Sequence, residues 1–379
     1  MPVAEPWVLV LGTADWDQPI ATNQHYVTRE LAREFRVTFV ESLGLRRPEL
    51  SRRDLRRVRR RLVGGVRAAG VSRPRPDGVE VLSPRLVPVH VGPVRGLNRA
   101  ALHRLVGRWS THRGPRVLWT YSPQTYGLET VAATMYHCVD LLAEVPGIPA
   151  RVVLDGERQL SGSGASAAAC TELVRDHLRT VGFPDPMLWP NVADVALYRD
   201  AAVGSVRTPA RAVFAGNLST SKVDFALLEA VARAGIDLHL AGPVAEGGGS
   251  AGVEVRRLVA AGATFHGVLA PAELAGLYAS ATVGLIPYLI NPYTRGVSPL
   301  KTFEYLAAGL CVVTTPLPGV QGSVDVLVAS GFSFVDAVVE HAAVPRADVL
   351  ARRVQEAERH SWTARGGVVR ETVHRLVTA

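Results

Sequence analysis

Residues 296–319 read GVSPLKTFEYLAAGLCVVTTPLPG, and this stretch carries the clearest fold signal in the chain. A loop containing Pro299 leads into a helical segment that breaks at Gly309, and a β-branched run follows at Val312–Thr315. A helix that turns through a glycine into a short apolar strand is typical of a parallel α/β sheet. The segment therefore predicts one helix–strand unit of such a sheet.

The same alternation extends outward in both directions. We expect strands at Trp7–Gly12, Val37–Val40, Val79–Leu82, Val117–Tyr121, Thr130–His137, Ala212–Ala215, Ile236–Ala241, Ala263–His266, Ala281–Pro287 and Cys311–Thr314. Amphipathic stretches lie between them, and loop residues accumulate around Asn191–Pro209. The pattern predicts two Rossmann-like, doubly wound α/β domains facing across a cleft. The expected bounds are 1–195 and 208–350, with helices of 351–379 crossing back to the first domain.

Composition narrows the class of protein. The chain has 379 residues, enough for two cores, and its longest apolar stretch, Ala279–Ile290, is too short to span a bilayer. The N-terminus reads as a strand and not as a signal peptide. Three distant cysteines, Cys138, Cys170 and Cys311, have no zinc or disulfide spacing. We expect a cytoplasmic protein with no structural metal.

Lysine is rare in this arginine-rich sequence. Of 42 basic residues only two, Lys222 and Lys301, are lysines. Lys301 stands at a predicted helix start, where free N–H groups also attract anions, and Glu304 one turn later has oxygens that can accept hydrogen bonds from two hydroxyls. This pattern suits a site for a phosphate-bearing ligand. By composition alone, however, the favoured interpretation is an amphipathic helix with a solvated lysine and glutamate.

These segments resemble the donor site of family-four glycosyltransferases of the GT-B fold. Glu304 and the following LAAG-x-VVTT match the second glutamate of their Glu-x7-Glu pattern, but the first glutamate is replaced by Gly296. The run SPLKTFEYLAAG is close to a bacterial polysaccharide-type subgroup that lacks the first glutamate, and Ser298, Leu300 and Lys301 within it are assigned to the donor site.

A second donor element lies in FAGNLSTSKVDFALLEAV, residues 214–231. The resemblance implies that Gly216 and Lys222 approach the donor diphosphate, while Asn217 stands where the family has an arginine. Arg295 or Lys301 is expected to compensate for the missing cation. In ATFHG, residues 263–267, His266 is a candidate for the base site or, alternatively, a strand-end histidine with structural bonds.

The resemblance implies a retaining, hexosyltransferase-like enzyme that uses a nucleotide-diphosphate sugar as co-substrate and no cofactor. No Asp-x-Asp motif stands at a strand end, so metal-independent transfer is expected, with phosphate charge neutralised by lysine and N–H groups. Metal-binding residues are therefore predicted to be absent.

The acceptor and catalytic candidates lie in the first half of the chain. VAATMYHCVD, residues 131–140, brings His137 and Asp140 to a strand end. His137 either lines the cleft or is a core histidine, and Asp140 either activates an acceptor or caps a turn. After the first strand, Gly12 and Asp15 are candidates for acceptor binding. His25 is either a third candidate for acceptor binding or a residue on a helix surface.

Residues Arg46–Arg61 hold nine arginines in sixteen positions. The first interpretation is a solvated basic face, and the second is an interfacial helix that contacts anionic membrane lipid. Nucleic-acid binding is the least favoured, because no RNA-binding motif or interleaved aromatic residue accompanies the arginines.

Three functions fit the sequence: a glycosyltransferase, a nucleotide-sugar epimerase or hydrolase on the same fold, and a basic peripheral binding protein with a degenerate site. The expected acceptor of the first is a saccharide, a lipid-linked saccharide or a secondary metabolite, taken through a hydroxyl or amine.

Overall fold

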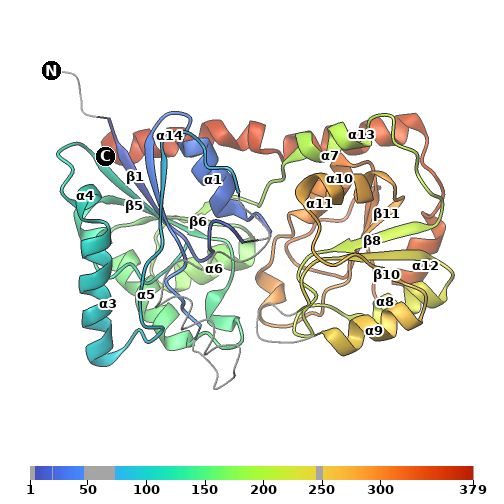
Figure 1. Cartoon of the computed structure of the whole chain (residues 1–379), viewed down its shortest axis with the longest axis horizontal. Helices are drawn as coiled ribbons and strands as arrows, with labels where there is room; N and C mark the ends of the chain where they lie inside the picture. The colour runs from blue at the N-terminus through green and yellow to red at the C-terminus, as the bar shows by residue number, and fades with distance from the viewer. Residues whose placement is uncertain (1–4, 19, 47–72, 245–250, 379) are drawn as a thin grey trace. The chain divides into compact units, whose positions relative to one another are not determined.

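The computed structural model describes residues 5–18, 20–46, 73–244 and 251–378 (Figure 1). The chain divides into two compact units, residues 1–190 with 366–379, and residues 191–365. The predicted basic helix, with Arg47 to Arg61 of the arginine-rich stretch, lies outside the described residues. Among those that are described, no helix is both long and apolar enough to cross a membrane.

The first unit is built on a parallel seven-stranded sheet with the order β3-β2-β1-β4-β5-β6-β7 within the described chain. Its strands are β1 Trp7–Leu11, β2 Arg36–Val40, β3 Val79–Leu82, β4 Arg116–Thr120, β5 Ala133–Cys138, β6 Ser166–Ala169 and β7 Met187–Leu188. Its helices are α1 Asn23–Leu31, α3 Gly92–Leu105, α4 Gly107–Ser110, α5 Ala150–Gly162, α6 Glu172–Thr180 and most of α14, Trp362–Thr378.

The second unit is built on a parallel six-stranded sheet with the order β10-β9-β8-β11-β12-β13 in the described chain. Its strands are β8 Arg211–Ala215, β9 Asp237–Ala241, β10 Thr264–Phe265, β11 Val283–Ile286, β12 Cys311–Thr314 and β13 Val326–Val328. Its helices are α7 Val195–Ala202, α8 Phe225–Arg233, α9 Gly252–Ala260, α10 Pro271–Ala279, α11 Lys301–Ala307, α12 Phe332–Glu340 and α13 Ala347–Arg359.

Helices cover both faces of the second sheet. In Figure 1, α8 and α9 lie on one side of its strands and α10 and α11 on the other. The apolar residues of β8, β11 and β12 are buried, which agrees with their continuous β-branched and aliphatic sequence. Each strand points its carboxyl end to the same edge, so the loops after β8, β9, β10 and β11 meet there.

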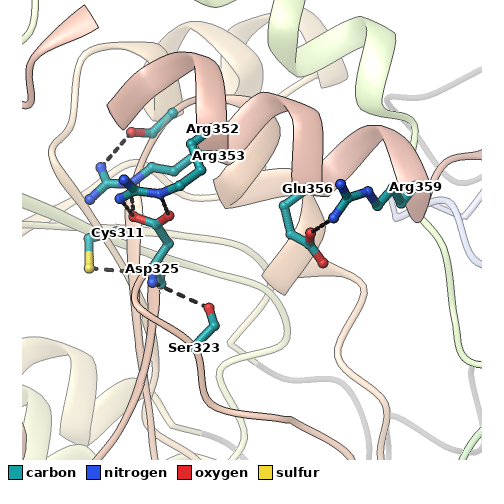
Figure 2. Close-up of polar contacts among 8 residues, drawn as sticks. Cys311, Ser323, Asp325, Arg352, Arg353, Glu356 and Arg359 are labelled. Carbon is teal, nitrogen blue, oxygen red and sulfur yellow. Dashed lines mark hydrogen bonds and ion pairs between the residues drawn. The ribbon is translucent and has the colours of Figure 1, made fainter. Parts of the chain in front are cut away.

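Helix α13 belongs to the second unit, which corrects the prediction that the helices from residue 351 cross back to the first. Figure 2 shows why: the carboxylate of Asp325, just before β13, accepts hydrogen bonds from Arg352 and Arg353 of α13. Arg353 also donates to the carbonyl of Gly309, 2.9 Å away. These bonds fasten α13 to the amino ends of β12 and β13.

Helix α14 contributes its residues from Gly366 onward to the first unit. Arg370 forms an ion pair with the buried carboxylate of Glu30 in α1 at 3.0 Å, and His374 contacts Glu34 and the ring of Phe35. A side chain at Gly366 would collide with the Glu30 carboxylate. The glycine therefore allows α14 to lie close against α1.

Candidate functional site

Three glycines bring backbone segments together at the carboxyl edge of the second sheet. Gly216 follows β8 with φ +145°, and Gly242 follows β9 with φ +130°. The Gly216 N–H donates to Ala241, and the Gly242 N–H donates to the carbonyl of Gly267 at 2.7 Å. A side chain at Gly242 would strike the Gly216 carbonyl. Only glycine suits this approach, because both positive φ and close backbone contact exclude a Cβ.

Lys301 places a buried ammonium group at this edge. The side chain is 9% exposed, and its Nζ donates to the Tyr288 hydroxyl at 2.6 Å. A Cβ on Gly216 would lie 2.7 Å from the same Nζ, so the charge sits directly over the glycine. Burial lowers the pKa of Lys301, and Tyr288 opposes that effect. The alternative of a solvated lysine is therefore wrong.

Lys222 approaches the same tyrosine from the loop after β8. Its Nζ lies 4.7 Å from the centre of the Tyr288 ring and 5.6 Å from that of Tyr293. The loop is held in place because the Leu289 N–H donates to the Lys222 carbonyl at 2.9 Å. Burial alone would raise the pKa of Tyr288, but Lys222 and Lys301 lower it below its ordinary value by favouring the phenolate. The two lysines of the chain thus meet around one phenol.

Glu304 lies one turn along α11 from Lys301 and is turned toward α7. Burial raises the pKa of Glu304 to about 7, against the lowering effects of Lys301 and of a hydrogen bond with Tyr198. The carboxylate of Asp194 adds to the rise. The predicted cations and the predicted hydroxyl acceptor therefore influence each other electrostatically. Lys222 lowers the pKa of Lys301, and Lys301 lowers the pKa of Glu304.

The remaining donor-site candidates have different surroundings. Ser298 is bound to Asn191, whose amide donates to the Ser298 carbonyl at 2.7 Å. Leu300 precedes the first turn of α11, and its carbonyl accepts the Glu304 N–H. Arg295 is exposed in a turn, and its backbone N–H donates to the carbonyl of Asn291 at 3.0 Å. Asn217 follows Gly216 directly and turns the loop through a bond from the Ser219 N–H to its carbonyl.

His266 follows β10 and is exposed, but its ring is bonded into a partly buried row of side chains. Its Nε2 lies 2.8 Å from Nδ1 of His239, and Nε2 of His239 lies 3.0 Å from Asp237. Arg211 completes the row by donating to Asp237 at 2.7 Å. Burial lowers the pKa of His239. The alternative of a strand-end histidine with structural bonds describes His266 well.

The catalytic candidates His137 and Asp140 are at the carboxyl end of the first sheet. The His137 ring is buried against Trp119, Tyr121 and Trp189, with ring centres 5.0 to 6.0 Å away. Asp140 is half-buried directly after β5, and its carbonyl accepts the Leu142 N–H. Strand β5 places both residues at this edge, as the sequence predicts. Three aromatic rings surround the His137 ring.

Gly12 and His25 serve packing in the loop after β1. A side chain at Gly12 would meet Gln24 at 2.7 Å and Phe39 at 2.9 Å, so internal packing and not ligand approach requires this glycine. The Thr22 N–H donates to Nδ1 of His25, and Nε2 faces the Asp15 carbonyl at 3.2 Å. Burial lowers the pKa of His25 to about 4. His25 is therefore a neutral, buried loop anchor and not a helix-surface residue.

Comparison with known proteins identifies the C-terminal region. Residues 209–343 match the family model of glycosyl transferases group 1. This region is therefore similar to group 1 glycosyltransferases. The matched region contains Gly216, Lys222, Tyr288, Lys301 and Glu304 and covers most of the second unit, without α7 and α13.

TuaH of Bacillus subtilis (strain 168), whose name assigns it to teichuronic acid biosynthesis as a glycosyltransferase, is 35% identical over 99 residues. That match spans 26% of this chain and about a quarter, 24%, of the relative's length.

Solved structures extend the likeness of fold to the whole chain. Anabaena HepE, in complex with UDP-glucose, is 13% identical with a TM-score of 0.61 over 97% of this chain and 99% of its own. WaaG, a glycosyltransferase involved in lipopolysaccharide biosynthesis, is 13% identical with a TM-score of 0.63 over 98% and 100%. The E. coli trehalose-6-phosphate protein bound to UDP-2-fluoro glucose is 11% identical with a TM-score of 0.65 over 97% and 98%. The chain therefore has a GT-B fold, and the region that matches the family model lies in its second unit.

Sequence reasoning missed Tyr288, which stands at the end of the run LIPY and joins both lysines. It also missed Gly242. The available signals were an aromatic residue at the carboxyl end of a strand and a glycine at the equivalent position of the neighbouring strand.

Proposed function

We propose that the chain is a glycosyltransferase that moves a sugar from a nucleotide-diphosphate donor to an acceptor hydroxyl or amine. One observation carries the proposal: the only two lysines of the chain converge on Tyr288 over Gly216, inside the region similar to group 1 glycosyltransferases. Backbone that approaches a ligand closely at a glycine, with ammonium groups beside it, suits a diphosphate.

The reaction needs positive charge where the leaving group develops negative charge. As the bond from the sugar to the diphosphate breaks, the phosphate oxygens gain charge, and Lys222 and Lys301 would stabilise them. Because two ammonium groups supply that charge, we propose metal-independent transfer. Glu304, when ionised, would accept hydrogen bonds from the ribose hydroxyls. Gly216, Asn217, Ser298, Leu300, Arg295 and His266 remain donor-site predictions in this scheme.

Retention of anomeric configuration and a role for His137 or Asp140 at the acceptor belong to the same proposal. The complexes of HepE with UDP-glucose and of the E. coli protein with UDP-2-fluoro glucose support a nucleotide sugar as the donor class. TuaH and WaaG, named for polymer and lipopolysaccharide biosynthesis, support a saccharide or lipid-linked acceptor. Membrane contact through the arginine-rich stretch and a cytoplasmic location stay predictions.

The direct test is thermal unfolding of the full chain with UDP, GDP and dTDP. We expect one of the three to raise the Tm, because a ligand that binds only the native state stabilises it. Lys222→Ala should remove most of that shift. The matched control is Arg233→Ala, which removes the same charge from an exposed position on α8. EDTA should leave both the shift and the transfer activity unchanged.

Three results would contradict the proposal in different ways. No shift with any nucleotide favours the basic binding protein with a degenerate site. Rapid conversion of a free nucleotide sugar without acceptor favours an epimerase or hydrolase. Loss of transfer on EDTA treatment would end the metal-independent scheme while leaving the donor class intact.

A further inference from the structure

Three segments of the chain hold Tyr288 at the carboxyl edge. Its N–H donates to the Thr315 hydroxyl at 3.1 Å, and that hydroxyl donates to the Tyr288 carbonyl at 2.7 Å. On the other side, residues 223 and 288 form a β-bridge, and the Phe214 ring meets the tyrosine edge-on at 6.3 Å. The backbone of Tyr288 is thus bonded to two segments, and its ring packs against a third.

The two ammonium groups around this phenol repel each other unless something between them compensates. The Tyr288 hydroxyl accepts the hydrogen bond from Lys301, and the electron-rich face of the ring lies toward Lys222. Phe214 adds a second ring, 4.7 Å from the Lys301 Nζ. Within the described part of the chain, Lys301 forms no ion pair with a carboxylate, so the phenol oxygen is its hydrogen-bond acceptor.

We infer that Tyr288 is a positioning residue for the diphosphate site: its hydroxyl and ring hold Lys301 and Lys222 together, charged and beside Gly216, until the anion arrives. This inference rests on the proposed function. Diphosphate oxygens are stronger acceptors than a phenol, so they replace the hydroxyl as the partner of Lys301 without a new arrangement of the loops. A site assembled before binding loses less free energy in ordering its side chains.

The electrostatics of the cluster agree with this role. Burial lowers the pKa of Lys301, and Tyr288 and Glu304 raise it again. Lys222 lowers it further, and Tyr305 is the other titratable group close to the phenol. Removal of the hydroxyl leaves a buried ammonium group without its acceptor, so Lys301 should lose its proton at a lower pH.

The test is calorimetric titration of the full chain with whichever of UDP, GDP and dTDP stabilises the unmodified protein most. Tyr288→Phe keeps the ring and removes only the hydroxyl. We expect the Kd to rise roughly tenfold at neutral pH, because Lys301 in the unbound protein loses the acceptor that holds it charged beside Gly216. We also expect the alkaline limb of the Kd–pH profile to move to lower pH. Tyr278→Phe, another fully buried tyrosine of the same unit, is the matched control and should change neither.

A double-mutant cycle separates positioning from simple packing. If Tyr288 acts through Lys301, then Tyr288→Phe should have little further effect on Kd once Lys301→Met is present. Additive effects of the two substitutions would overturn the inference, and so would a Tyr288→Phe variant with unchanged Kd and unchanged alkaline limb. If no nucleoside diphosphate binds the unmodified chain, the proposed function fails first. Binding that survives while the cycle is additive removes only the role of Tyr288.

Discussion

The two edges of the second sheet hold their cations in opposite ways. At the amino edge, arginines meet carboxylates or carbonyl oxygens: Arg211 binds Asp237, Arg353 binds Asp325, and Arg207 donates to the carbonyls of residues 281 and 308. At the carboxyl edge, Lys301 donates to a phenol. An arginine neutralised by a carboxylate fixes structure, whereas an ammonium group held by a neutral partner keeps its charge for a ligand.

The largest expected effect is on the amino edge. Asp325→Ala should lower the free energy of unfolding by about 3–5 kcal/mol, because it leaves the buried Arg353 without its carboxylate. Urea unfolding followed by circular dichroism measures the loss. Asp348→Ala is the control, since it breaks an exposed ion pair between the first turn of α13 and its N-cap residue Arg346. A loss of less than about 1 kcal/mol for Asp325→Ala would contradict the claim that the arginine–carboxylate pairs of the amino edge stabilise the fold.

At the carboxyl edge, loss of a cation should weaken ligand binding and leave stability nearly unchanged. Lys301→Met replaces a buried ammonium group by an apolar side chain of similar length, so we expect stability to stay equal or rise by about 1 kcal/mol. The Kd of the bound nucleoside diphosphate should rise roughly a hundredfold, since a charged hydrogen-bond donor is lost. Unfolding and calorimetric titration give the two values. A large loss of stability with unchanged Kd would make Lys301 a structural residue like Arg353.

The pH dependence of binding should report on Glu304. Its pKa of about 7 means that the carboxylate is ionised above that pH and protonated below it. If the ionised form accepts two ribose hydroxyls, affinity should fall roughly tenfold between pH 8 and pH 6, following the protonation. Titration of nucleoside diphosphate against pH measures this, with Glu304→Gln expected to flatten the profile. An unchanged slope in that variant would assign the pH dependence to another group.

The smallest effect should come from Asp237 at the amino edge. Burial opposes ionisation, but bonds from Arg211 and His239 lower the pKa of Asp237 below its ordinary value. Its contribution to stability is therefore present above the unfolded pKa and is lost as the pH falls through the folded pKa. Asp237→Asn should cost less than about 1 kcal/mol at pH 7, because the pair is partly exposed. The difference in the free energy of unfolding between this variant and the unmodified chain should vanish at pH 2. A difference that persists at pH 2 would show that lost packing, and not lost charge, is responsible.

Sequence patterns predicted ten of the thirteen strands that the structure describes and missed the short or edge strands β6, β7 and β13, while the donor role of the lysines stays a prediction. Buried parallel strands have a strong apolar signature, as in β8 and β12, and rare lysines stand out against many arginines. The role of Tyr288 was not predictable, because it depends on a loop near residue 222 and a helix start at residue 301 reaching one phenol. The place of α13 was equally hidden, since Arg353 and Asp325 are 28 residues apart and either could have been a surface charge.

The return of α14 to the first unit has a consequence for the order of synthesis. Glu30 and Arg370 are separated by 340 positions, so the first unit is completed only after residues 191–365 have been translated. Until α14 emerges from the ribosome, a nascent chain keeps the Glu30 side of α1 uncovered. Removal of residues 366–378 would therefore harm the unit that contains β1 to β7, far away in the sequence.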